Sequence, residues 1–229
     1  MNFWFNRLFL VTASFLCSSA LPIEECQPLV TPVSLADPSV LYGKINVIAG
    51  YTDHQVFNEI LKVTDSSWLK ISESPVDPKK LVMTEENKLN GKCFSSSVNF
   101  TIEGNTAVTE ANITSNFKVL PSCEGCLVLS VNVTAGDISK LLGLMNITTP
   151  ITDDELHVQA VYLMAKESTL KDSDLEHFKK QASCLGFDRE PDYVHDTKNG
   201  GWSSELPLKY SYQDSAGFYL RLSLHRVLS

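Results

Sequence analysis

The sequence predicts an all-β fold: an eight-stranded antiparallel up-and-down barrel with a C-terminal α-helix packed outside it. Eight short runs rich in Val, Ile, Thr and Phe follow one another between residues 43 and 165, separated by turn residues. Apolar and polar residues alternate within these runs, as in strands with one buried face. One amphipathic helical stretch follows. Consecutive short strands are typical of a barrel or a sandwich, and the pattern alone does not separate the two.

The chain before the strands, residues 21–41, is expected to be extended. It contains Pro22, Pro28, Pro32 and Pro38, which disfavour helices and central strands. The strands predicted after it are Lys44–Ala49, Ser67–Ser72, Lys80–Thr84, Gly91–Glu103, Thr106–Thr114, Asn116–Leu120, Cys126–Thr134 and Glu155–Ala165.

Two dipeptides, Asn90-Gly91 and Gly104-Asn105, predict hairpin turns between neighbouring strands. The clearest alternation falls on the seventh predicted strand. There Leu127, Leu129, Val131 and Val133 share one face, and Ser130, Asn132 and Thr134 share the other.

The helix is predicted from a possible capping box at Ser173–Glu176. An apolar stripe follows at Leu175, Phe178, Ala182 and Leu185, and Gly186 provides a stop signal. A weaker helix is predicted over Ile138–Met145. Beyond Asn199-Gly200-Gly201, the mixture of aromatic residues and leucines in 210–229 fits either a loosely packed appendage or a strand-like segment without an evident place in the barrel.

The N-terminus predicts export. Arg7 is the only charged residue before Glu24, and Leu8–Cys17 is an apolar run too short to span a bilayer. Ser18-Ser19-Ala20 resembles a signal-peptidase site, so cleavage is expected after Ala20. We therefore divide the chain into a signal peptide (1–20), a barrel domain with its helix (21–198) and a divergent, loosely ordered tail (199–229).

Sequons and cysteines agree with a secreted, extracellular protein in a plasma-like fluid. Four N-x-T sequons predict glycosylation at Asn99, Asn112, Asn132 and Asn146. The five cysteines after the signal should pair in an oxidising compartment, although five is an odd number. The net charge of −8 argues against partners such as nucleic acid or anionic membrane surfaces.

Several segments resemble lipocalins. Tyr42-Gly43-Lys44-Ile45 occupies the place of the G-x-W signature, with Ile45 instead of tryptophan. The runs 160–166 and 175–185 resemble the last strand and the C-terminal helix of α1-acid glycoprotein. Residues from Ala20 to about Lys198 also resemble the fish saxitoxin- and tetrodotoxin-binding and tributyltin-binding lipocalins. The resemblance implies a barrel whose base is closed by aliphatic packing in place of the tryptophan.

The resemblance also implies a disulfide between Cys26 in the arm and Cys184 in the helix. A second family bond would join Cys93 to a cysteine just past the helix, where this chain has none. Cys93 is then the expected odd thiol, which makes a Cys93-linked dimer the alternative to a monomer. Cys123 and Cys126 are expected to bond to each other; a bond from Cys93 to one of them is the alternative. A redox C-x-x-C is disfavoured because the pair lies in a β-turn.

The sequence lacks the motifs of the common enzyme classes. It has no G-x-S-x-G, H-E-x-x-H, P-loop or G-x-G-x-x-G, and its five histidines show no zinc-pair spacing. The acidic run Asp153-Asp154-Glu155 has no surrounding calcium-loop pattern. We therefore expect neither an enzyme nor a metal or cofactor protein.

The resulting hypothesis is a carrier that binds one small hydrophobic or amphipathic ligand inside the barrel. According to the resemblance, the ligand could be cationic and toxin-like. Glu85, expected near the mouth, would attract a cation, and Tyr162 would add a hydroxyl. The alternative is a secreted interaction or immunomodulatory glycoprotein with a filled barrel. The predicted ligand-binding residues are Leu69, Ile71, Leu81, Met83, Glu85, Leu129, Val131, Ala160 and Tyr162.

Overall fold

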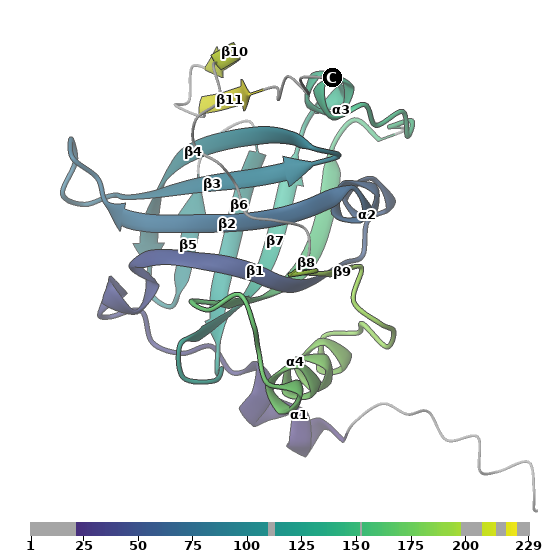
Figure 1. The fold of residues 1–229 in the computed structure, drawn as a ribbon. Coiled ribbons are helices and arrows are strands. Elements are labelled where there is room, and N and C mark those ends of the chain that lie inside the picture. Colours follow the sequence, from purple (N-terminus) through teal and green to yellow (C-terminus); the bar gives the residue numbers. More distant parts are fainter. Residues whose placement is uncertain (1–21, 110–112, 152, 198–207, 214–218, 224–229) are drawn as a thin grey trace, which may run out of the picture.

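A computed structural model describes residues 22–109, 113–151, 153–197, 208–213 and 219–223 of the chain (Figure 1). Eight antiparallel strands pair in sequence order, and pairing of β1 with β8 and of β4 with β5 closes them into a barrel. The barrel prediction is therefore confirmed, and the sandwich is excluded. The strands are β1 Gly43–Thr52, β2 Thr64–Glu73, β3 Leu81–Leu89, β4 Lys92–Glu103, β5 Thr106–Thr109, β6 Ile113–Leu120, β7 Cys126–Ala135 and β8 Leu156–Ala165.

The two hairpin predictions are confirmed. Asn90 and Gly91 connect β3 to β4, and both have positive φ (47° and 73°). A type I′ turn requires positive φ at both central residues, and Asn-Gly accepts it at low cost. Gly104, at φ 64°, begins the short connection from β4 to β5.

The base of the barrel is closed by apolar side chains, but not by aliphatic packing alone as predicted. Phe100 of β4 is buried there beside Leu81, and its ring meets that of Phe117 edge-on. Ile45 at the start of β1 lies in a buried cluster with Leu35 and Leu41 from the preceding segment. The arm reaches this position as an extended chain, since the amide of Val33 donates to the carbonyl of Val119 on β6. A short 3-10 helix, Pro38–Leu41, then leads into β1.

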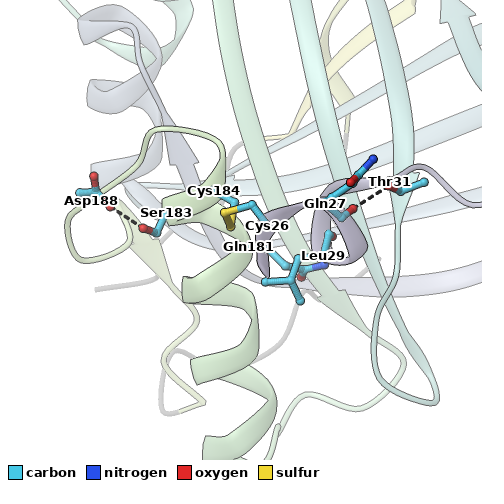
Figure 2. The surroundings of a disulfide bond; sticks show 8 residues. All are labelled: Cys26, Gln27, Leu29, Thr31, Gln181, Ser183, Cys184 and Asp188. Atoms are coloured by element: carbon cyan, nitrogen blue, oxygen red, sulfur yellow. Dashed lines mark hydrogen bonds between the residues drawn. A yellow bond between two sulfur atoms is a disulfide. The ribbon is translucent and has the colours of Figure 1, made fainter. Parts of the chain in front are cut away.

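The first part of the arm differs from the prediction. Ile23–Val30 forms a helix, α1, although Pro28 lies inside it. Proline removes one backbone donor, and tertiary contacts here compensate for that loss. Cys26 is bonded to Cys184 (Figure 2). The Gln181 Nε2 donates to the carbonyls of Leu29 (2.9 Å) and Pro121 (2.7 Å). The prediction of an extended chain was wrong for this segment. The proline content shows a local preference only, and it cannot reveal that a helix far along the chain holds the segment in place.

The late helix, α4, spans Asp172–Cys184 and packs outside the barrel. Phe178 and Ala182 are fully buried against outward-facing residues of β1 and β8, including Tyr51 and Val161. The second disulfide, Cys123–Cys126, lies in the turn before β7.

The sequence predicted a signal at each end of α4, and only the signal at the C-terminal end is confirmed. The capping-box prediction was wrong, because the N-cap is Lys171 without a side-chain cap bond and Ser173 already lies within the first turn. The stop signal was right. Gly186 has φ 94°, and the amides of Gly186 and Phe187 donate to the carbonyls of Ser183 and Ala182, which is a Schellman ending.

Two short helices lie at the other end of the barrel, its mouth. α3, Ser139–Met145, matches the weaker helix prediction. α2, Gln55–Lys62, was not predicted, although Val56, Phe57, Ile60 and Leu61 have helical spacing. Ile60 of α2 and Met145 of α3 pack with the buried pair Leu89 and Phe94 of the β3–β4 hairpin.

Beyond α4, the short strand β9 (Tyr193–Val194) pairs with β1. Two strands of the tail are described, β10 (Leu208–Gln213) and β11 (Tyr219–Ser223). They pair with each other. β11 also pairs with residues Cys93–Ser97 of β4, whereas β5 pairs with residues Phe100–Glu103 of the same strand. The tail thus contributes a strand pair to the sheet (Figure 1). That residues 199–229 are loosely ordered stays a prediction.

The structure also places most of the predicted modification sites. Asn99, Asn132 and Asn146 are exposed, whereas Asn112 lies outside the described residues, as does the predicted signal peptide. Cys93 is buried on β4 and takes part in neither the Cys26–Cys184 nor the Cys123–Cys126 disulfide.

Candidate ligand-binding site

The interior of the barrel contains a cavity of about 290 Å³ between the apolar base and the helices at the mouth. Side chains of seven barrel strands, β1–β4 and β6–β8, reach it, together with Thr109 of β5. Phe57, Ile60 and Leu61 of α2 and two residues of α3 line the mouth end. The volume is close to the lower end of the range typical of small-molecule sites.

Six of the nine predicted ligand-binding residues line this cavity. They are Leu69, Met83, Glu85, Leu129, Val131 and Tyr162. The strand phase taken from alternation was therefore correct for β2, β3, β7 and β8.

The other three predicted residues face inward but do not line the cavity. Ile71 and Leu81 belong to the packed base, because β2 and β3 continue past the cavity floor. Ala160 of β8 is buried beside Val131 of β7, but its methyl group is too short to reach the cavity. Alternation in the sequence predicts whether a strand residue faces into the barrel. Whether that residue also borders the cavity depends on its height relative to the cavity floor.

Glu85 lies elsewhere than predicted. It was expected at the mouth, near the end of a strand that finished at Thr84, but β3 continues to Leu89. Glu85 therefore occupies the middle of the strand, paired with Leu69 on β2 and Ser96 on β4. Its side chain is partly exposed, and it borders the cavity rather than the outer surface.

The environment of Glu85 disfavours its charged form. Burial raises the pKa of this carboxyl above its ordinary value, and a hydrogen bond from the Ser96 hydroxyl, at 3.4 Å, offsets part of the rise. Burial also raises the pKa of Tyr162, with a smaller contribution from the nearby Glu85 charge. The Tyr162 hydroxyl therefore stays protonated at neutral pH and can donate a hydrogen bond.

Polar side chains gather on one wall of the cavity. Ser67 pairs with Asn87 across β2 and β3, and Glu85 pairs with Ser96 across β3 and β4. Because β3 and β7 are four strands apart in an eight-stranded barrel, Leu129 and its neighbours form the wall opposite Glu85. That wall is largely apolar, so the cavity is amphipathic across its width.

Tyr162 of β8 pairs with Gly50 of β1, and its ring lies where any residue other than glycine would place a side chain. A Cβ atom at Gly50 would lie 2.7 Å from Cδ1 and 2.9 Å from Cε1 of Tyr162. The glycine therefore lets the ring settle against the barrel wall, which leaves the space in front of it open.

Sequence reasoning missed many lining residues, and most were within its reach. Ser67, Asn87, Val133 and Met164 each lie two residues from a predicted lining residue, so they share its face. The amphipathic spacing of 56–61 could have shown α2. Tyr193, which also lines the cavity, follows α4 and carries no sequence signal for that position.

The described residues offer little for other chemistry. They contain no group of three or more His, Cys, Asp or Glu side chains that could hold a metal ion. No helix within the described segments is long and apolar enough to cross a membrane. The observed arrangement is an amphipathic cavity inside the barrel, with one carboxyl group among its described lining residues, which suits the binding of a small molecule.

No family model and no curated protein matches this chain. Among solved structures, it is similar to the siderocalin Ex-FABP, with a TM-score of 0.51 and 13% identity over 69% of this chain and 95% of the other. The bovine lipocalin allergen Bos d 2 (TM-score 0.46, 21% identity, 71% and 91% covered) and the odorant-binding protein OBP1 (0.45, 13%, 68% and 88%) also match. The first similarity, at this low identity, shows the fold alone, and that fold is the lipocalin fold.

Proposed function

We propose that this chain is a secreted member of the lipocalin family that carries a small hydrophobic or amphipathic ligand inside its barrel. The observation that carries the proposal is the cavity of about 290 Å³ inside the barrel, lined mainly by apolar side chains with a few polar groups on one wall. A carrier needs such a space, whereas the alternative of a filled barrel does not.

A known protein with this fold supports the proposal by analogy. The siderocalin Ex-FABP is described as acting through dual ligand specificities. The narrower resemblance to α1-acid glycoprotein and the fish toxin- and organotin-binding lipocalins comes from sequence segments, and it stays a prediction.

Secretion is part of the proposal and has independent support. The Cys26–Cys184 and Cys123–Cys126 bonds suit an oxidising compartment, and three of the sequon asparagines are exposed. The predicted signal peptide would direct the chain there.

Titration with an environment-sensitive apolar dye tests the carrier function. We expect one saturable site with micromolar affinity, since buried apolar ligand surface contributes about 25 cal/mol per Å² before ordering costs. Leu129→Arg should abolish binding, because its long side chain would extend from the wall opposite Glu85 and fill the space of the ligand.

Ser130→Arg is the matched control, since Ser130 is the next residue on β7 and faces outward. It should bind like the parent, and circular dichroism must show that both variants keep their β structure. Equal binding by both variants would show that the lumen is not the site. A parent protein without saturable binding would instead favour a filled barrel.

A further inference from the structure

The cavity contains an acidic group without a basic partner. Among the described lining residues Glu85 is the only carboxylate, and none is Lys, Arg or His. Its one hydrogen bond within the described part of the chain comes from the Ser96 hydroxyl, at 3.4 Å. A carboxyl group accepts up to four hydrogen bonds when ionised, so most of its capacity is open to the cavity.

The groups that face Glu85 from other elements do not balance its charge. Leu69 lies beside it on β2, Ser96 beside it on β4, and Leu129 on the opposite wall. The other titratable side chains at the cavity are Tyr162 of β8 and Tyr193 of β9, and burial raises the pKa of both. Both are therefore neutral hydroxyls at physiological pH.

A carboxyl group in such a place costs stability, because burial without a cation disfavours its charged form. A bound ligand can supply the missing cation or hydrogen-bond donor. We propose that the cavity selects small ligands with an apolar body and a protonated amine or similar cationic head, and that Glu85 determines this specificity by accepting the head group. The inference rests on the proposed carrier function and names its ligand class.

The shape of the cavity agrees with such a ligand. The apolar body would lie against Leu129 and Val131, and the head would meet Glu85 with Ser67, Asn87 and Ser96 around it. A volume of about 290 Å³ limits the ligand to a small molecule.

The same arrangement makes binding depend on pH. A cation bound beside Glu85 favours the ionised carboxylate, so binding at pH values below the raised pKa of Glu85 should release a proton to solvent. The affinity for a cation should therefore increase as pH rises through the raised pKa of Glu85, whereas the affinity for a neutral ligand should not.

The test compares octylamine, octanol and octanoate, which share a chain length and differ in their head group. Each displaces the apolar dye from the full-length secreted protein at pH 7.5. We expect octylamine to bind most tightly and octanoate most weakly. Glu85→Gln keeps the size of the side chain, and it should weaken octylamine binding by about 10- to 100-fold, the range for a lost hydrogen bond to a charged group. Octanol binding should change far less, because its neutral hydroxyl can hydrogen-bond to either side chain.

Two further measurements complete the test. Glu103→Gln, at the exposed end of β4, removes an equal charge outside the cavity and should leave all three affinities as in the parent. Calorimetry in two buffers with different ionisation enthalpies should show proton release with octylamine at pH values below the raised pKa of Glu85, and none with octanol.

The possible failures are distinguishable. If dye and octanol bind but octylamine has no advantage, or if Glu85→Gln leaves the amine-to-alcohol ratio unchanged, this inference is wrong and the carrier function stands. If octanoate binds most tightly, the inference is also wrong. If the parent shows no saturable dye binding, the carrier function fails and the inference fails with it.

Discussion

Replacing Gly50 by alanine should force Tyr162 away from the barrel wall. The new Cβ would lie 2.7 Å from Tyr162 Cδ1, and ordinary contact begins near 3.4 Å, so the ring must retreat by about 0.7 Å. Overpacking of this kind costs about 1–3 kcal/mol. The φ angle of Gly50 is not positive, so alanine adds no backbone strain that could account for the loss.

A double-mutant cycle isolates the clash. With Tyr162→Ala the ring is gone, and the nearest remaining neighbour of a Cβ at position 50 is the carbonyl oxygen of Val161 at 3.8 Å, an ordinary contact. In that background Gly50→Ala should be neutral, or stabilising by up to about 1 kcal/mol, since alanine loses less conformational freedom on folding than glycine. Urea unfolding of the four proteins gives the coupling free energy, which we expect to be about 1–3 kcal/mol.

The same cycle has a functional readout. The displaced ring should move into the cavity, so Gly50→Ala should weaken dye binding in the parent background. An equal loss of stability from Gly50→Ala with and without Tyr162 would refute the reasoning, because the cost would then come from a different contact.

Three further predictions concern stability and export. Removing Cys26 and Cys184 together by serine substitution should lower the free energy of unfolding by about 5 kcal/mol in the chain-entropy model, since the bond joins residues 158 apart. The matched pair Cys123→Ser and Cys126→Ser opens a separation of three and should cost only about 2 kcal/mol, so equal losses in urea unfolding would contradict this account. Glu85→Gln should make the protein more stable than the parent at pH 7.5 but not at pH 4. Burial raises the pKa of Glu85 in the folded state, so above about pH 4.5 the folded state holds a proton that the unfolded state has lost. The free energy of unfolding should therefore fall as pH rises from about 4.5 toward the raised pKa. The same pH dependence in the variant would exclude Glu85 as the cause. A secretory cell should release the protein into the medium with N-glycans that a glycan-cleaving enzyme removes, and Asn99→Gln, Asn132→Gln and Asn146→Gln should each reduce the glycan mass; a retained, unshifted product would end the export proposal.

Local rules determined much of the fold from the sequence. Alternation in 127–134 gave the inward face of β7, and Asn90-Gly91 gave the hairpin that precedes β4. The position of α4 followed from its apolar stripe and from Gly186. In each case the signal comes from residues a few positions apart, which is the range over which backbone preference and side-chain periodicity act.

Contacts between distant residues decided what the sequence could not. α1 forms around Pro28 because Cys184 and Gln181, about 150 residues away, hold it in place. Glu85 lies in the middle of β3, on the cavity wall, and not at the expected mouth, because pairing with β2 and β4 extends β3 to Leu89. Alternation turns Ile71 on β2 and Met83 on β3 inward, but only the closed barrel buries the first in the base and leaves the second beside a cavity. The volume of that cavity depends on how the side chains of all eight strands and the two mouth helices meet, and no single segment of the chain contains this information.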